Sequence, residues 1–364
     1  MMQLSQQKQI NKNGVIEFMR FLFASGIVFF HTSRDFWNNQ KIIGQIGQFQ
    51  VTFFRKGNIG VEFFFLVSGC LLASHIYKLN SPVLSVGEET VGFLWKKVRQ
   101  IMPYYLPACF MMACIKVARG GVKRAGLFEK LPSLLFLQRT GGFPESFIPV
   151  VWYISSMLIA MAVIYPICRR YYKTYTVLIA PLACCLLLGA LIHNTGGLGG
   201  SGTWMFVTYK TNIRAFAVIG MGTTCYEVSR RMRERSWNPI GQKGLSAAAV
   251  VCYMVVLCYV ISNVDSKFSI HMFYLMCIAV TITFSETGWI ARTHFFQKQI
   301  FMYLGSLSLP LYLFQNVPRR SLPHFFRGMA PQYLCVLIYL GTLVLAMAAN
   351  RTVTLIRFRK GNHG

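Results

Sequence analysis

Ten apolar stretches, each long enough to cross a bilayer, constrain the fold of this chain more than any other feature. Because a helix must satisfy its own backbone polar groups in lipid, about 20 apolar residues suffice to span ~30 Å of hydrocarbon. The sequence therefore predicts an all-α, polytopic membrane helix bundle of about ten transmembrane helices, forming a single domain over residues 1–364. The predicted spans lie near 15–33, 59–77, 101–118, 147–168, 174–193, 203–227, 244–262, 269–287, 300–317 and 332–350.

The composition agrees with a membrane protein and argues against several other classes. The chain is 54% hydrophobic and only 13% charged, with a formal net charge of +26. Its basic residues form short clusters between the apolar stretches, where they would anchor at lipid headgroups, so we expect no nucleic-acid partner. The 11 cysteines lie in or beside apolar stretches without paired spacing. They indicate neither a disulfide framework nor a zinc site, and no metal is expected.

Charge between the spans predicts the orientation. Residues 1–13 are polar, contain Lys8 and Lys12, and lead directly into the first span, so we expect no cleavable signal. If this segment is cytoplasmic, the cytoplasmic side holds a modest excess of the 37 Lys and Arg residues, including a basic tail at 351–364. The sequence therefore predicts a multi-pass protein of the inner (cytoplasmic) membrane with both termini in the cytoplasm.

The first span carries four ionisable side chains on one face. Arg20 and His31 are eleven residues apart, which corresponds to about three helical turns and about 16 Å along the axis. Glu17 lies three residues before Arg20, and Asp35 lies four residues after His31. Because a charge inside a span costs roughly 2.5–3.5 kcal/mol, such residues usually mark a functional site. We therefore interpret Glu17, Arg20, His31 and Asp35 as candidate catalytic residues.

Each of these residues also has a purely structural interpretation. His31 is suited to removing a proton from a hydroxyl group near neutral pH, with Asp35 orienting its ring, but both could equally be ordinary interfacial residues. Arg20 could pair with Glu17 to hold the helix, or bind a phosphate-bearing donor, or both. Glu62 in the second span is a further intramembrane carboxylate and a candidate partner for Arg20.

Further candidates for donor binding lie outside the first span. Arg214 lies inside a predicted span and has no acidic neighbour in the sequence. The cluster of Lys96, Lys97 and Arg99 precedes a span expected to begin or bend at Pro103. It could anchor the chain at lipid headgroups or bind the phosphate groups of the donor. Tyr312 is a candidate for lining the cavity expected beside Arg20, although an interfacial or core position is commoner for Tyr.

Two elements near the N-terminus are specific when taken together. An acidic residue precedes an Arg by three positions and a His follows after ten more residues, as in Glu17, Arg20 and His31. A Gly-Val-acidic-x-Phe-Phe-x-x-Ser-Gly element follows. These elements resemble the membrane-bound acyltransferase 3 family of bacterial envelope-modifying enzymes. The second element is matched by Gly60, Val61, Glu62, Phe64, Phe65, Ser68 and Gly69.

Weaker elements extend the resemblance through most of the chain. They are Lys96, Lys97, Pro103 and Tyr105, then residues 152–155, residues 214–220, and finally Gly305, Ser308 and Tyr312. Two positions depart from the family pattern. Gln100 stands where an Arg is expected, with Arg99 one place earlier, and Gln315 replaces a frequent His.

The resemblance implies acyl transfer from a cytoplasmic acyl-CoA, most often acetyl-CoA, to a hydroxyl of an envelope or extracellular glycan or glycolipid. In that chemistry His31 would be the general base, and Arg20, Lys96, Lys97, Arg99, Arg214 and Tyr312 would serve the donor. Two alternatives remain open at this point. A proton-coupled exporter or flippase also needs intramembrane Glu, Arg and His residues. A non-catalytic relative that supports glycan-assembly proteins would explain Gln100 and Gln315.

Overall fold

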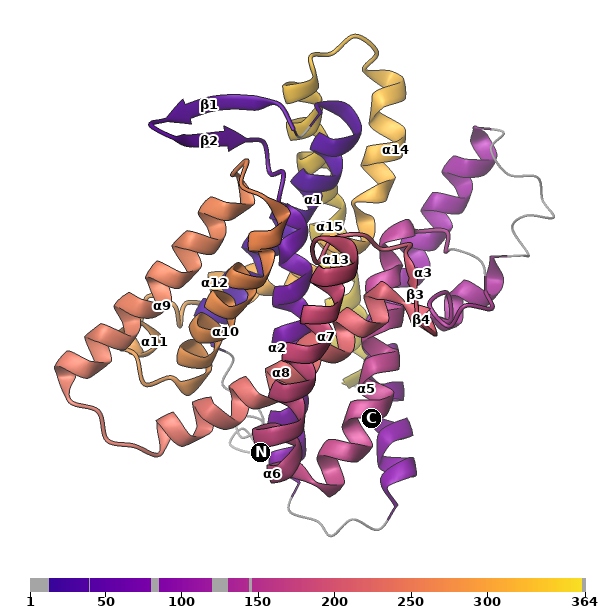
Figure 1. Ribbon diagram of the computed structural model, residues 1–364. Helices are drawn as coiled ribbons and strands as arrows, with labels where there is room; N and C mark the ends of the chain where they lie inside the picture. Colours follow the sequence, from indigo (N-terminus) through magenta and orange to yellow (C-terminus); the bar gives the residue numbers. More distant parts are fainter. Residues whose placement is uncertain (1–12, 39, 80–84, 120–129, 144–145, 362–364) are drawn as a thin grey trace.

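The structure is a computed structural model that describes residues 13–38, 40–79, 85–119, 130–143 and 146–361, with side chains left out at 291–292 and 360–361. Helices run roughly along one direction and form a bundle (Figure 1). Asn13 caps the first helix, whereas the rest of the expected N-terminal segment 1–13 and the last three residues of the tail lie outside the described residues. The helices are α1 (Gly14–Phe36), α2 (Gly60–Tyr77), α3 (Val86–Ala118), α5 (Trp152–Arg170), α6 (Tyr172–Thr174), α7 (Ala180–Thr195), α8 (Lys210–Arg233), α9 (Pro239–Val260), α10 (Ser269–Ser285), α11 (Trp289–Arg292), α12 (Gln299–Ser306), α13 (Ser308–Phe314), α14 (Asn316–Phe325) and α15 (Pro331–Gly361).

The predicted all-α membrane fold is confirmed. In the described part of the chain, eight helices are long and apolar enough to cross a membrane, or nine if α12–α14 counts as one span. The ten predicted spans therefore exceed this count by two, or by one if α12–α14 is a span. The excess includes α8, which covers the predicted span 203–227 but carries many polar residues. Because α8 packs against α2, α5, α7 and α10, protein rather than lipid surrounds most of it, and its polar residues are tolerated.

The third predicted span is corrected. Instead of beginning at Pro103, α3 begins at Val86, where the Ser85 side chain accepts a hydrogen bond from the backbone N–H of Glu88. The helix then continues through Pro103 and Pro107. Tertiary packing of a long helix outweighs the loss of a backbone hydrogen bond at each proline. The basic cluster at 96–99 consequently lies on α3 itself.

The ninth span is broken. The segment Gln299–Phe314 and the helix Asn316–Phe325 meet at an angle of 61°. The break falls at Gln315 and Asn316, whose side chains are both buried. A broken helix inside a membrane protein is stable only where surrounding groups or a polar cavity satisfy the freed backbone, so polar residues at the bend are expected on physical grounds.

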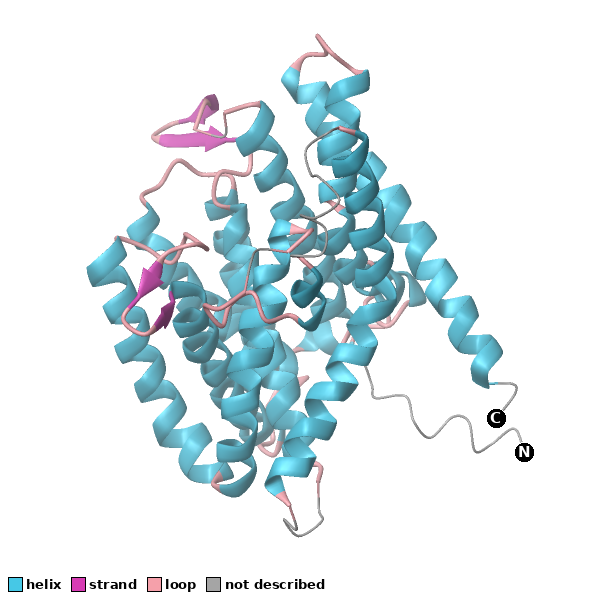
Figure 2. Ribbon diagram, turned by 90° about the vertical axis from the view of Figure 1, so that its right-hand side faces the viewer, coloured by secondary structure: helices cyan, strands magenta, loops and turns pink. Residues whose placement is uncertain are grey.

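Two short hairpins lie outside the bundle. Strands β1 (Ile42–Ile46) and β2 (Phe49–Thr52) pair antiparallel, and β3 (Trp204–Met205) pairs with β4 (Thr208–Tyr209). The first hairpin projects beyond the end of α1 (Figures 1 and 2). It is joined to the bundle by an isolated bridge between Val51 and Ser262, at the end of α9. Short helical turns complete the structure: η2 (Gly57–Ile59), η3 (Leu131–Leu135), η4 (Pro149–Val151), the π-helical η5 (Tyr175–Ile179) and η6 (Ser266–Phe268).

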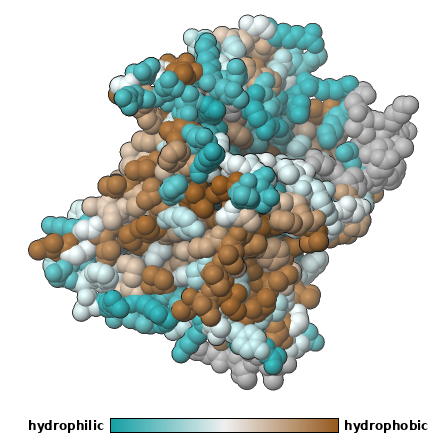
Figure 3. Space-filling model, in the orientation of Figure 1, coloured by the Kyte–Doolittle hydropathy of each residue, from teal (hydrophilic) through white to brown (hydrophobic). Residues whose placement is uncertain are grey.

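Apolar side chains form the outer surface of the bundle. Figure 3 shows hydrophobic residues over the middle of the molecule and polar residues gathered mainly toward its upper end. Phe110, Leu186, Met254 and Val344 are among the large apolar residues that are exposed on different helices. In water such a surface would drive aggregation, but in a bilayer it contacts acyl chains. The arrangement supports a multi-pass membrane protein.

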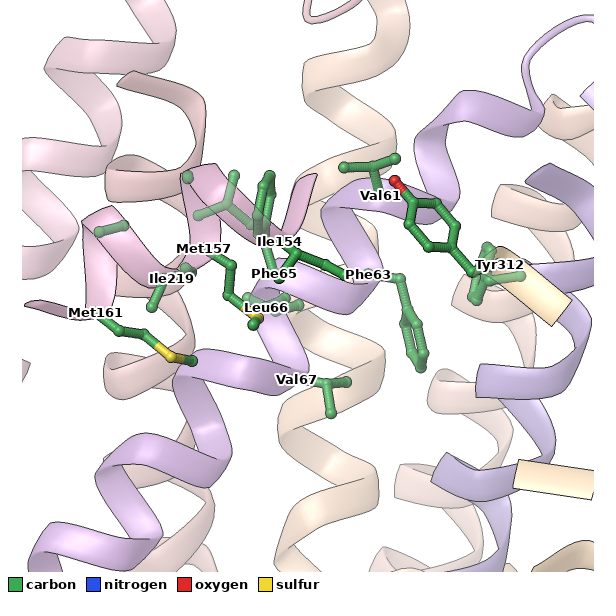
Figure 4. Packing of buried hydrophobic residues seen from close by; sticks show 14 of the residues in the cluster. Val61, Phe63, Phe65, Leu66, Val67, Ile154, Met157, Met161, Ile219 and Tyr312 are labelled. Carbon is green, nitrogen blue, oxygen red and sulfur yellow. The ribbon is translucent and has the colours of Figure 1, made fainter. Parts of the chain in front are cut away.

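The tightest helix crossing joins α2 and α8. A Cβ atom on Gly69 would lie 2.0 Å from the carbonyl oxygen of Ile219, and one on Gly222 would lie 2.2 Å from that of Leu66. Around this crossing Leu66, Val67, Met157 and Ile219 pack into the apolar core (Figure 4). Small residues allow such close backbone contact within a membrane.

We expect replacement of Gly222 by Leu to prevent normal folding, because a side chain cannot fit against the α2 backbone. Fluorescence-detected size-exclusion chromatography of a tagged protein would measure the folded fraction. Gly189→Leu is the matched control, since a Cβ at this position on α7 meets no atom within 4 Å. Equal monodisperse peaks for both variants would contradict the proposed crossing.

Candidate functional site

An ion pair near the start of α1 joins Glu17 to Arg20. The Arg20 Nη1 donates to both carboxylate oxygens, at 3.1 and 2.9 Å. Glu17 is buried, whereas 29% of the Arg20 side chain is exposed. Gly305 on α12 lies against Glu17, since a Cβ atom on this glycine would lie 1.9 Å from Oε2. The carboxylate is thus held between two helices, and it fixes the guanidinium in turn.

A second cation lies near Arg20. The charges of Arg20 and Lys97 interact, although they belong to different helices, α1 and α3. Lys97 is partly buried, its ammonium group lies 5.5 Å from the centroid of the Phe93 ring, and we find no ion pair for it in the described part of the chain. By contrast, Lys96 and Arg99 are exposed. Two cations and one carboxylate leave an excess of positive charge, which favours an anionic ligand.

His31 lies toward the other end of α1. Its Nδ1 atom is buried and has no hydrogen-bond partner. The charged side chains that act on the ring are Arg319 and Arg34. Asp35 does not orient the ring as expected, because its two oxygens lie 3.5 Å from Arg34 Nε and 3.3 Å from Arg319 Nε. Two guanidinium groups attract a carboxylate more strongly than a neutral imidazole does, and this electrostatic preference explains the difference.

The broken span supplies polar groups beside this end of α1. The ion pair between Arg319 and Asp35 joins α14 to α1. Asn316 lies one turn before Arg319 on α14, and His31 lies one turn before Asp35 on α1. The two helices run in the same direction (Figure 1). Both side-chain atoms of Asn316, Oε1 of Gln315 and Nη1 of Arg319 are buried without hydrogen-bond partners. Unpaired buried polar atoms are costly, so their clustering indicates a site prepared for a polar ligand or water.

Apolar residues lie between the two polar ends of α1. Ala24, which lies one turn after Arg20 on the way to His31, packs in a buried cluster with Leu307, Leu311 and Ala346. Arg20 and His31 therefore belong to two polar regions at different levels of α1, rather than to one open chamber. We call them the Arg20 site (Glu17, Arg20 and Lys97) and the His31 site (His31, Gln315, Asn316 and Arg319).

Comparison with known proteins gives one match. The family model of the acyltransferase 3 family, described as an acyltransferase domain, matches residues 13–351, which is nearly the whole chain. The chain belongs to the acyltransferase 3 family. This assignment confirms the resemblance noted in the sequence, and it supports a membrane acyltransferase. No curated protein and no solved structure matches the chain.

In this acyltransferase family member, Glu62 pairs with Arg214 and not with Arg20. Their closest atoms are 3.4 Å apart, and the side chains are 1% and 3% exposed. Arg214 also donates to the carbonyl oxygen of Leu198 at 2.6 Å and lies over the Trp152 ring. The pairing was not visible in the sequence because the two residues are 152 positions apart. Arg214 is therefore an internal cation that is paired with Glu62 in the core of the bundle.

Tyr312 also lies in the core. Its hydroxyl donates to the carbonyl oxygen of Val150, and its ring is 5.6 Å from that of Tyr153. Figure 4 shows Tyr312 beside Val61 of α2, among apolar side chains. These contacts give Tyr312 a packing role between α13 and α5.

The polar residues of α14, Asn316 and Arg319, were not predicted from the sequence. Arg319 lies beyond the end of the predicted span 300–317, yet it is 4% exposed and lies against α1. The signal available was the spacing of Asn316 and Arg319 by three residues, which puts both on one helical face. The family's frequent His at the position of Gln315 also pointed to this turn. Among the described residues no group of His, Cys, Asp or Glu could hold a metal ion, and the cysteines are free.

The contact between Gly305 and Glu17 yields a prediction. We expect Gly305→Ala to lower activity strongly while leaving the protein folded, because a methyl group would displace the carboxylate that holds Arg20. The measurement is acyl transfer by the purified variant. Gly92→Ala on α3 is the control, since a Cβ there meets no atom within 4 Å. Full activity in the Gly305 variant would show that Glu17 does not need its present position.

Proposed function

We propose that this protein is an integral membrane O-acyltransferase that moves an acyl group, most often acetyl, from cytoplasmic acyl-CoA to a hydroxyl of an envelope or extracellular glycan. The observation that carries the proposal is the buried, unpartnered Nδ1 of His31 beside the unpaired polar atoms of α14. Membership of the family supplies the class of reaction. The orientation with both termini in the cytoplasm is part of the proposal.

In the proposed reaction His31 acts as a general base. Its free ring nitrogen takes the proton of an acceptor hydroxyl while the hydroxyl oxygen attacks the thioester carbonyl carbon. The carbon–sulfur bond then breaks, the acyl group stays on the acceptor oxygen, and the thiolate of CoA receives the proton from His31. Arg319 and Asn316 provide donors for the negative charge that develops on the carbonyl oxygen.

The Arg20 site is the proposed place for the phosphate groups of the donor. A guanidinium held by Glu17 and a neighbouring ammonium from Lys97 match the charge of a phosphorylated nucleotide. This site lies about 16 Å from His31 along the axis of α1. The long pantetheine arm of CoA would bridge that interval, provided that it displaces the small apolar cluster around Ala24 and Leu311. The cluster would prevent leakage when no donor is bound.

A liposome assay tests the proposal against its main alternative. Purified protein would receive acetyl-CoA on one side and a polysaccharide extract on the other, and free CoA would be measured with a thiol reagent. The proposal predicts CoA release that increases with the extract, without net movement of the glycan. Glycan flux without any acyl donor would instead establish a transporter. Mass spectrometry of the recovered glycan would identify the acyl group and its position.

A further inference from the structure

A separate polar pocket opens at the end of the bundle that carries the β1–β2 hairpin. Its volume is about 240 Å³, and its walls come from η2, the start of α2, the loop after α7, the end of α9 and the start of α10. Neither Arg20 nor His31 lines it. The polar residues in its lining are Lys56, Asn58, Glu62, Thr195, Tyr259, Ser266 and Ser269.

Glu62 provides an acceptor at the base of this pocket. It is 1% exposed, and neither carboxylate oxygen has a hydrogen-bond partner. Arg214 balances its charge from 3.4 Å, but the hydrogen-bonding capacity of the oxygens is left open. Because a buried carboxylate without donors is costly, the pocket is suited to a ligand that brings hydroxyl or amide hydrogens.

Lys56 provides a donor on another wall. Its ammonium group donates to the Ser266 hydroxyl at 2.8 Å and lies 5.9 Å from the centroid of the Tyr259 ring. Burial lowers the pKa of Lys56, as does the neighbouring Arg55, whereas Asp265 raises it. Since an ammonium group has three hydrogens, Lys56 retains capacity for a further acceptor. A cation in the lining also argues against a metal site at Glu62.

The loop after α7 is held rigidly in place as the third wall. The buried ammonium group of Lys210 donates to the Thr195 hydroxyl at 2.6 Å and to the carbonyl oxygen of Gly197 at 2.7 Å. Arg214 adds a bond to the carbonyl oxygen of Leu198 at 2.6 Å. The pocket is therefore formed before any ligand arrives, which reduces the entropy lost on binding.

These features together describe a site for one small polyhydroxylated ring. The walls carry both donors and acceptors, Tyr259 contributes an aromatic ring, and the volume is below the range of about 300–1,000 Å³ typical of drug-sized ligands. We propose that this pocket binds one sugar residue of the acceptor glycan, as a subsite separate from the His31 site. The inference rests on the proposed function for the nature of the acceptor.

The position of η2 connects this subsite with His31. A Cβ atom on Gly57 would lie 2.4 Å from the carbonyl oxygen of Gly26 and 2.9 Å from Cβ of Phe30. Thus η2 packs directly on the turn of α1 that precedes His31, while Asn58 and Ile59 face the pocket. A glycan of several residues could place one sugar in the pocket and another at His31. Such an arrangement would select an oligosaccharide over a free monosaccharide.

Direct binding tests the inference without any acyl donor. Saturation-transfer difference NMR on the purified full chain would use methyl glycosides of glucose, galactose and N-acetylglucosamine as probes. Gly199→Leu should fill the pocket, because a Cβ there points toward the Asn58 amide at 3.5 Å. Gly202→Leu is the matched control, because it lies in the same loop and meets no atom within 4 Å. We expect at least one probe to bind with a Kd that rises at least tenfold in Gly199→Leu and not in Gly202→Leu.

A second variant and a separate readout make the outcome decisive. Lys56→Met should also weaken binding, whereas His31→Ala should leave it unchanged. If no probe binds the unaltered protein, or if Gly199→Leu and Lys56→Met bind as tightly as it does, the sugar subsite is wrong. Donor-dependent CoA release, measured on the same preparations, reports independently on the proposed function. Sugar binding without CoA release would remove the acyltransferase proposal while keeping the pocket.

Discussion

Replacement of His31 by Ala is expected to lower acyl transfer by about 10²–10⁴-fold, because the variant loses the only group proposed to accept the hydroxyl proton. The substitution removes the imidazole ring from a polar region that already contains unpaired atoms. Folding should therefore be little affected. The measurement is acylation of the surface glycan in cells, by mass spectrometry, together with CoA release by purified protein.

Two variants accompany this experiment. His31→Gln keeps a polar side chain of similar length but cannot act as a base, and we expect it to be as inactive as His31→Ala. His271→Ala removes an exposed imidazole from α10 and should leave the activity unchanged. Normal acylation in His31→Ala, at equal protein level, would refute general-base catalysis by this residue.

Replacement of Arg214 by Met is expected to cost about 3–5 kcal/mol of stability, because it leaves the buried Glu62 carboxylate without its counter-charge. The variant also loses the bond that holds the Leu198 carbonyl. Thermal unfolding in detergent, followed by size-exclusion chromatography, would show the loss as a lowered midpoint.

A double variant separates charge from packing. Glu62→Gln combined with Arg214→Met removes both charges of the pair, so most of the lost stability should return. Arg34→Met is the matched control, since its side chain is 52% exposed and its pair with Asp35 spans 3.5 Å. If the double variant were as unstable as Arg214→Met alone, the cost would come from lost packing instead of an uncompensated charge.

Several local features could be predicted because they depend on neighbours in the sequence. The pairing of Glu17 with Arg20 follows from a spacing of three residues on one helix, and the structure contains it. The close contact at Gly69 follows from the absence of a side chain within an apolar span. The start of α3 was missed because prolines near a helix start favour a boundary, whereas membrane packing here carries the helix through them.

By itself, the sequence determined that this chain is a helical membrane protein, because apolar length and intrahelical hydrogen bonding depend only on consecutive residues. It also determined the family, through the elements at residues 17–31 and 60–69. Only the tertiary structure decided that Glu62 belongs to Arg214, that Asp35 belongs to Arg319 instead of His31, and that apolar packing separates Arg20 from His31. The physical reason is that partners for buried charges are chosen by the crossing of helices far apart in the chain, and no local pattern specifies those crossings.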